Sequence, residues 1–470
     1  MIFVIKSHGF RGFTYMRNSN KNLIKGASIL GVGAFLAKIL GAVYRIPLTN
    51  LLGGYGIGLY QMIFPVYALL LDFSGAGLPS ALSHIIAKEQ FDKDKKAREY
   101  LMVSLKLLWI LGVIFAVLMC VFSLPISKLQ GNKNAYIGYI FLSPSIFFVA
   151  IISCFRGYFQ GKLQMLPTAT SQIIEQVIKL AFGLTLTRLF LPNIKMAVAG
   201  ATLAITLSEI FALIYLIIQY KVQTKKLKLP LVNVKNGASD KEKIKKIIKA
   251  TLPITLIGII LPLSQVVDSF ITINILSLYN SNATTLFGLY SGVALTIVGL
   301  PVSVCHGIST VAIPTVSAQS NIKNQTESAK KIMGLTLLLS LPCAIIFYIF
   351  APQIISILYR SLGGQEKGVA INLLRLTCPC IVLLSVLQTQ NGILIGKGKF
   401  YLPIFSLSAG VIIKIILNII LLNQPSINIY GSGIALIACY FFGCLINLFI
   451  IMNFKVRNEN PRNYRRRYAN

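Results

Sequence analysis

The chain alternates long apolar stretches with short polar segments. A transmembrane helix needs about 20 mainly apolar residues, and twelve stretches of the sequence reach that length. They are 23–49, 57–87, 101–124, 136–157, 167–190, 196–220, 248–277, 286–317, 330–357, 369–395, 402–422 and 430–453. The pattern predicts an all-α integral membrane protein with about twelve transmembrane helices.

A weak internal repeat relates the two halves of the chain. Gly58-Leu59-Tyr60, followed by Gly77, recurs 230 positions later as Gly288-Leu289-Tyr290, followed by Gly307. Because each half holds six predicted helices, both halves enter the membrane from the same side. We therefore expect two pseudo-symmetric six-helix lobes, related by an axis along the membrane normal, with a transport site between them.

Polar segments divide the chain into five predicted regions. The expected order is a cytoplasmic N-terminal segment 1–22, a first lobe 23–220, a basic cytoplasmic linker 221–247, a second lobe 248–453 and a basic cytoplasmic tail 454–470. The second and eighth apolar stretches are long and contain several Gly and Pro residues, so we expect bent helices there. Bends at matching places favour a cavity lining, and simple crossing of helices at small residues is the alternative.

The net charge of +32 is distributed as in a membrane protein. With the N-terminus inside, the inner segments hold 33 Lys and Arg residues and the outer loops hold 6. This asymmetry predicts a multi-pass protein of the bacterial cytoplasmic membrane with both termini cytoplasmic. The basic linker and tail are expected to face anionic membrane lipids, and nucleic acid is not an expected partner.

Composition argues for transport and against catalysis. The chain is 55% hydrophobic and 12% charged, with a mean hydropathy of +0.73. The eight cysteines include no CxxC pair and no Cys/His cluster with zinc spacing. There is no P-loop pattern and no nucleophile or carboxylate–histidine constellation. We expect no cofactor or metal and no enzyme activity; energy would come from the membrane potential, the substrate's own gradient or a coupling cation such as Na⁺ or H⁺.

Several ionisable side chains fall within the predicted spans, where charges are costly and are functional candidates by default. They are Lys38, Arg45, Asp72, Glu175, Lys179, Glu209, Asp268, His306 and Lys414. The repeat offset of 230 makes Lys38 and Asp268 equivalent, so they can face each other across the cleft; alternatively, each neutralises a neighbour in its own lobe. Glu175 and Lys179 are four residues apart and can form an ion pair.

The cationic residues suit a phosphate or pyrophosphate, because arginine offers bidentate contacts and lysine a point charge. We therefore predict that Lys38, Arg45, Lys179 and Lys414 bind the substrate. The predicted coupling or polar cavity residues are Asp72, Asp268, Glu175 and His306. Lys179 and Lys414 are themselves related by a second repeat offset of 235 positions.

Two segments resemble the polysaccharide-biosynthesis flippases, the group that includes stage V sporulation protein B and the MurJ-type lipid II flippases. They are ILGAVYRIPLTNLLGGYGIGLYQMIFPVYALLLDFSGAGLPSALSHIIAKE at 39–89 and GLYSGVALTIVGLPVSVCHGISTVAIPTVS at 288–317. The resemblance implies an inverted-V fold of the multidrug/oligosaccharidyl-lipid/polysaccharide exporters, with helices one, two, seven and eight around a central cavity. Many of these flippases carry two further helices, and this chain is expected to have twelve.

The resemblance also implies a substrate and part of its site. The family flips an undecaprenyl-pyrophosphate-linked glycan by alternating access. Cationic residues on the first helix are thought to hold the pyrophosphate, and Lys38-Ile39-Leu40-Gly41 resembles the Arg-Val-Leu-Gly of that helix. Arg45 lies one position from the family's next arginine. We expect a monomer that takes a lipid-linked oligosaccharide, lipid II for peptidoglycan synthesis.

Two other functions remain open from the sequence. One is a cation-coupled multidrug exporter of the same fold, which would confer drug resistance through its acidic residues. The other is a non-transporting scaffold that organises cell-wall synthesis enzymes. A scaffold would tolerate changes at Lys38 and Arg45 and would be sensitive to changes in residues 221–249.

Overall fold

The computed structural model describes residues 8–88, 93–226, 238–317, 322–399 and 401–453. The described residues are helical nearly throughout and contain no strand. Ten segments among them are long and apolar enough to cross a membrane. The prediction of an all-α integral membrane protein is confirmed.

The helices follow the apolar stretches in order. The first half contains α1 (His8–Leu71), the π-helical η1 (Asp72–Ala76), α2 (Leu78–Lys88), α3 (Lys93–Val121), α4 (Ser123–Leu129), the short η2 (Lys133–Ala135), α5 (Tyr136–Gly161), α6 (Met165–Phe190) and α7 (Ile194–Lys226). The second half contains α8 (Ala238–Ser277), α9 (Ala283–Phe287), the π-helical η3 (Gly288–Ala294), α10 (Leu295–Ser317), α11 (Ile322–Ile349), α12 (Ala351–Leu358), α13 (Gly364–Thr377), α14 (Pro379–Gly396), α15 (Leu402–Leu422) and α16 (Tyr430–Asn453).

Two differences reduce the twelve predicted spans to ten apolar segments. The first two predicted spans share one continuous segment, Ile39–Ala87. This segment is divided at Gly53, whose φ of 66° and ψ of −177° lie outside the helical range. Only glycine adopts this conformation readily, so the chain breaks there between two helices. The other difference is α6, which carries Glu175, Lys179 and Arg188 and is not among the ten segments.

Each of the two long predicted spans contains a π-helical segment, and only the first of these segments lies among the glycines and prolines that were expected to bend the helix. In the second predicted span, η1 contains Gly75, whose φ is 139°. In the eighth, η3 begins at Gly288, within the repeated Gly-Leu-Tyr motif, and the expected bend residues Gly299, Pro301, Gly307 and Pro314 follow it in the helix α10. A π-helical turn adds a residue to the helix and is frequent at functional sites.

The described residues pack into two compact units. The first unit contains residues 1–293 and 356–367, and the second contains 294–355 and 368–470. The first unit therefore includes α8 and α9 in addition to the helices of the first half. The lobe limits expected from the sequence stay predictions, because the linker residues 227–237, the first seven residues and the tail 454–470 lie outside the described residues.

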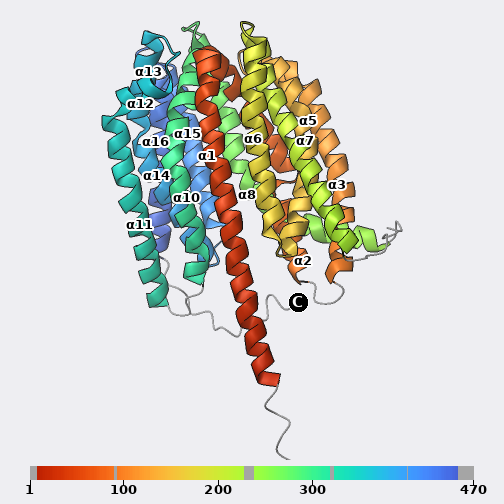
Figure 1. Ribbon diagram of the computed structural model, residues 1–470. Coiled ribbons are helices and arrows are strands. Elements are labelled where there is room, and N and C mark those ends of the chain that lie inside the picture. The colour runs from red at the N-terminus through yellow and green to blue at the C-terminus, as the bar shows by residue number, and fades with distance from the viewer. Residues whose placement is uncertain (1–7, 89–92, 227–237, 318–321, 400, 454–470) are drawn as a thin grey trace, which may run out of the picture. The chain divides into compact units, whose positions relative to one another are not determined.

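In the first unit, α5 packs between α3 and α7, and α6 packs on α7 and α1. Figure 1 shows α3, α5, α6 and α7 running side by side. The core between α2, α3, α5 and α7 is apolar and aromatic, and it includes Leu82, Leu101, Tyr158, Phe159 and Leu216, all buried. In the second unit, α10 packs on α14 and α15 packs on α16.

Candidate functional site

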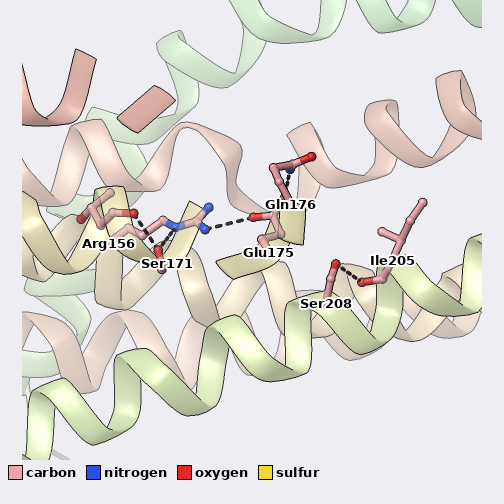
Figure 2. A network of polar contacts seen from close by, with 7 residues as sticks. Arg156, Ser171, Glu175, Gln176, Ile205 and Ser208 are labelled. Atoms are coloured by element: carbon pink, nitrogen blue, oxygen red, sulfur yellow. Dashed lines mark hydrogen bonds and ion pairs between the residues drawn. The ribbon is translucent and has the colours of Figure 1, made fainter. Parts of the chain in front are cut away.

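An ion pair links α5 to α6 inside the first unit. The Arg156 Nη2 atom lies 3.1 Å from the Glu175 Oε2 atom, and the Arg156 Nε–H donates to the Ser171 Oγ atom at 3.1 Å. The Gln176 side-chain amide donates to the Glu175 Oε1 atom at 3.0 Å. Figure 2 shows these contacts, which engage both carboxylate oxygens of Glu175.

Among the described contacts, Glu175 forms its ion pair with Arg156 and not with Lys179, the partner predicted from the sequence. The Lys179 Nζ atom lies 5.9 Å from the centre of the Tyr44 ring, which is the geometry of a cation–π contact. The charges that act on Lys179 are those of Glu175, Glu209 and Arg45.

Glu209 adds a second buried carboxylate to this region. It lies on α7 with 5% of its surface exposed, and the charges acting on it are those of Glu175, Arg156 and Lys179. These four residues form what we call the α5–α6–α7 charge cluster. Its two acids and two bases balance formally, and such balance is what makes charges tolerable in an apolar interior.

Arg156 is the member of the cluster that sequence reasoning missed. It falls at the end of the predicted span 136–157, and the structure places it in α5 with a partly buried side chain. Its partner Glu175 is 19 residues away on the next helix. No local spacing rule detects such a pair, although an arginine one residue before the end of the predicted apolar stretch 136–157 was a usable signal.

Arg45 lies on α1 among aromatic side chains. Its guanidinium is 5.6 Å from the centre of the Phe64 ring. Its charge also acts on Tyr60, Tyr359 and Lys179. The structure therefore brings together three of the predicted site residues, Arg45, Glu175 and Lys179, in the first unit.

The predicted coupling residues Asp72 and Asp268 lie at different heights along α8. Asp72 is on a neighbouring segment, and Asp268 is on α8 itself. Asp72 opens η1 and is half-buried, and a Cβ atom on Gly258 would lie 3.6 Å from its carboxyl carbon. Asp268 is buried on α8 itself. Gly258 and Asp268 are ten residues apart, which is roughly 15 Å along a helix. These two acids therefore do not form one site.

The remaining predicted site residues cannot be joined to this group. The Lys38 side chain lies outside the described residues, so the Lys38–Asp268 pair stays a prediction. His306 on α10 and Lys414 on α15 belong to the second unit. Lys414 is buried, and its charge acts on Cys380. In the described part of the chain, no three His, Cys, Asp or Glu side chains are grouped as metal ligands would be.

The two copies of the Gly-Leu-Tyr motif pack directly on each other in the first unit. A Cβ atom on Gly288 would lie 2.6 Å from the Gly58 nitrogen and would also meet the Gly54 carbonyl oxygen. A Cβ atom on Gly58 would meet the carbonyl oxygen of Thr284. Glycine is required at both positions because the backbones approach too closely for any side chain.

Hydrogen bonds surround this glycine contact. The Asn132 amide donates to the Thr284 hydroxyl at 2.9 Å, and the Asn134 amide donates to the Tyr55 hydroxyl at 2.7 Å. The Asn50 amide donates to the carbonyl oxygen of Leu358 at 2.7 Å. We call these contacts the outer polar network, because all of them fall in or beside segments that the charge pattern assigns to the outer side.

Comparison with known proteins gives two family matches. The family model described as polysaccharide biosynthesis protein matches residues 23–320, and the MatE model matches residues 253–420. The first match covers both segments that carry the resemblance noted in the sequence, so that resemblance is confirmed.

Curated relatives from Bacillus subtilis (strain 168) match most of the chain. Stage V sporulation protein B is 27% identical over 430 residues, which cover 89% of this chain and 81% of the relative. The lipid II flippase MurJ is 26% identical over 451 residues, which cover 91% of this chain and 82% of the relative.

Solved structures show the same fold at low identity. An inward-facing multidrug resistance MATE family transporter of the MOP superfamily aligns with a TM-score of 0.71 and 15% identity, covering 88% of this chain and 94% of the other. The lipid II flippase MurJ in an inward closed conformation aligns with a TM-score of 0.70 and 17% identity, covering 90% of this chain and 87% of the other.

Proposed function

We propose that this chain, which belongs to the polysaccharide biosynthesis protein family, is a flippase for an undecaprenyl-pyrophosphate-linked glycan. The substrate that we propose is the peptidoglycan precursor lipid II, and the mechanism is alternating access. The chain is a multi-pass, all-α membrane protein with the fold of the MOP-superfamily transporters.

The observation that carries the proposal is the proximity of Arg45 on α1 to Lys179 on α6. The Lys179 Nζ atom lies 5.9 Å from the centre of the ring of Tyr44, the neighbour of Arg45 in the chain, and the charge of Arg45 acts on Lys179. A pyrophosphate has several anionic oxygens, and an arginine beside a lysine gives it both bidentate and point-charge contacts. Glu175 is engaged by Arg156 and Gln176, so it fits a positioning role better than direct contact with an anion.

Alternating access requires that one side be closed while the other is open. The outer polar network and the Gly58–Gly288 contact hold the outer ends of helices from both halves together in the first unit. This arrangement supports a cycle in which the headgroup enters from the cytoplasmic side. The lipid tail would stay in the bilayer while the headgroup moves.

The energy source that we propose is a cation, Na⁺ or H⁺, acting through an intramembrane acid. Asp72 is the preferred candidate, since its half-buried carboxylate opens a π-helical segment beside Gly258. Asp268, Glu175 and His306 remain the other candidates. A cation that binds one conformation better than the other shifts the equilibrium between them by that difference in affinity.

Complementation of a strain depleted of its lipid II flippases tests the substrate and the site together. The wild type should restore growth, while Arg45→Ala and Lys179→Ala should not, at equal expression. Arg188→Ala is the matched control, because Arg188 is an exposed cation at the end of α6. Rescue by all variants would keep the function and refute this site. No rescue by a well-expressed wild type would refute lipid II as the substrate.

The second candidate function is a cation-coupled multidrug exporter. It is favoured by the MatE match over residues 253–420 and by the structural likeness to a multidrug transporter. Expression in a drug-sensitive host separates the two functions. Drug resistance that is lost in Asp72→Asn, without rescue of the flippase-depleted strain, would favour the exporter.

A further inference from the structure

The beginning of α8 is an amphipathic segment with one face fixed against the first unit. The Lys243 Nζ atom lies 2.8 Å from the Glu99 Oε2 atom of α3, and the Lys246 ammonium donates to the Tyr100 hydroxyl at 3.1 Å. Ile247 is buried in the core formed with α3 and α5. These contacts determine which face of the segment points away from the protein.

The opposite face carries three exposed lysines in a row. Lys241, Lys245 and Lys249 recur every four residues, which places them on one side of a helix, about 6 Å apart along its axis. We call them the lysine ridge. Ile244 and Ile248 lie beside the ridge, and the five side chains line an open groove with a volume of about 440 Å³. No ion pair of a ridge lysine is found in the part of the chain that the structure describes.

The ridge lies where the protein enters the bilayer. The apolar stretch predicted from the sequence begins at residue 248, and Ile248 and Leu252 are 45% and 53% exposed on α8. The apolar span that the structure describes is Gly258–Ser277, about 30 Å long, which matches the hydrocarbon core, so residues 248–257 extend from the core through the headgroup layer toward the inner side. Lys249 therefore lies at the outer edge of the headgroup layer, and Lys245 and Lys241 lie about 6 Å and 12 Å farther along the helix, on the side that the charge pattern assigns to the cytoplasm.

We propose that the lysine ridge, together with Ile244 and Ile248, is a binding surface for an anionic phospholipid of the inner leaflet. The ammonium groups would bind the lipid phosphate, and the exposed Ile248 would contact the apolar part of the headgroup region. Charge complementarity selects the phospholipid as the occupant, because a basic surface at this depth faces anionic headgroups. Bound lipid would hold α8 at a fixed depth where it begins to span the membrane, whatever cargo the protein carries.

Spin-labelled lipids in nanodiscs test this surface in the full-length protein. The nanodiscs contain phosphatidylcholine and phosphatidylglycerol, and the measured quantity is the preference of the protein for labelled phosphatidylglycerol over labelled phosphatidylcholine. The variant Lys241→Gln/Lys245→Gln/Lys249→Gln should lose most of this preference. Each lysine contributes roughly fivefold in affinity at low salt, so the loss at the ridge site should be on the order of 100-fold.

A matched control removes the same charge elsewhere on the inner side. Lys95→Gln/Lys221→Gln/Lys330→Gln changes three exposed lysines that do not form a ridge, and it should keep the preference. Equal losses in both variants would overturn the proposal, because bulk charge would then explain the effect. A wild type without any preference for phosphatidylglycerol would also overturn it. So would a preference that a short-chain prenyl pyrophosphate abolishes at equal concentration, because the occupant of the ridge would then be the substrate.

Discussion

The side-chain amide of Gln61 donates a hydrogen bond of 2.8 Å to the backbone carbonyl oxygen of Ser291. The two residues are 230 positions apart, and each directly follows one copy of the Gly-Leu-Tyr motif. Equivalent positions of the repeat therefore meet, as they do where a symmetry axis passes between two related elements. The repeat that is weak in the sequence is thus a physical contact in the folded first unit.

The Gly58–Gly288 contact predicts a strong effect of the smallest possible substitution. Gly288→Ala would place a methyl group 2.6 Å from the Gly58 nitrogen, and the obstacle is backbone that cannot rotate away. We expect a loss of about 1–3 kcal/mol in the free energy of unfolding, as for other overpacked sites. Thermal unfolding in detergent, followed by intrinsic fluorescence, measures the loss.

Gly299→Ala is the control for that measurement, because a Cβ atom on Gly299 would meet nothing within 4 Å. It should leave the unfolding temperature unchanged or raise it slightly, since alanine is the better helix former. Equal unfolding temperatures for the two variants would show that the glycine contact does not constrain the protein.

Asn50 offers a test of the outer polar network. Its amide donates to the Leu358 carbonyl, and its Oδ1 atom accepts from the Ser361 backbone N–H and hydroxyl. Asn50→Ala should release residues 356–367 from α1, because the Leu358 carbonyl and the Ser361 groups then lose their partner and bond water instead. Hydrogen exchange followed by mass spectrometry should show faster exchange in that segment, by about tenfold for a loss of about 1.4 kcal/mol.

Asn423→Ala is matched to this change, because the Asn423 amide bonds only the carbonyl of Ile419 on its own helix among the contacts described. It should leave exchange in 356–367 unaltered. If residues 356–367 exchange at the same rate in Asn50→Ala as in the wild type, Asn50 does not hold this segment in place.

The charge cluster predicts that a double substitution is milder than a single one. Arg156→Met leaves Glu175 and Glu209 facing each other with less positive charge, so we expect a destabilisation of about 3 kcal/mol or more. Arg156→Met/Glu175→Met removes the pair together and should recover a large part of that loss. A double-mutant cycle on thermal stability measures the coupling, and strictly additive effects would show that the pair contributes nothing specific.

The helices and the internal repeat could be predicted from the sequence because both depend on local or periodic information. Apolar stretches of the right length specify the spans, and the glycines of the repeated motif specify where backbones meet. Partner choice among charges did not follow from spacing: Glu175 and Lys179 share a helical face, yet Glu175 bonds Arg156 on α5. The packing of α5 on α6 decides this, and a local pattern has no access to it. The sequence predicted a loop between the spans 23–49 and 57–87. The structure has instead two helices that meet at Gly53, because the residues on both sides of this glycine stay helical.

Asp72→Asn tests the coupling that we propose for the transport cycle. The substitution keeps the shape of the side chain and removes both its charge and its ability to bind a proton or a metal cation. Translocation of a fluorescent lipid II analogue in proteoliposomes should then proceed at a rate that no longer responds to an imposed Na⁺ or H⁺ gradient. Asp94→Asn is the matched control, since Asp94 lies at the very beginning of α3, where it pairs with Lys162, and should keep the response. A gradient response in Asp72→Asn equal to that of the wild type would transfer the coupling role to Asp268, which lies roughly 15 Å farther along α8 and can be tested by the same substitution.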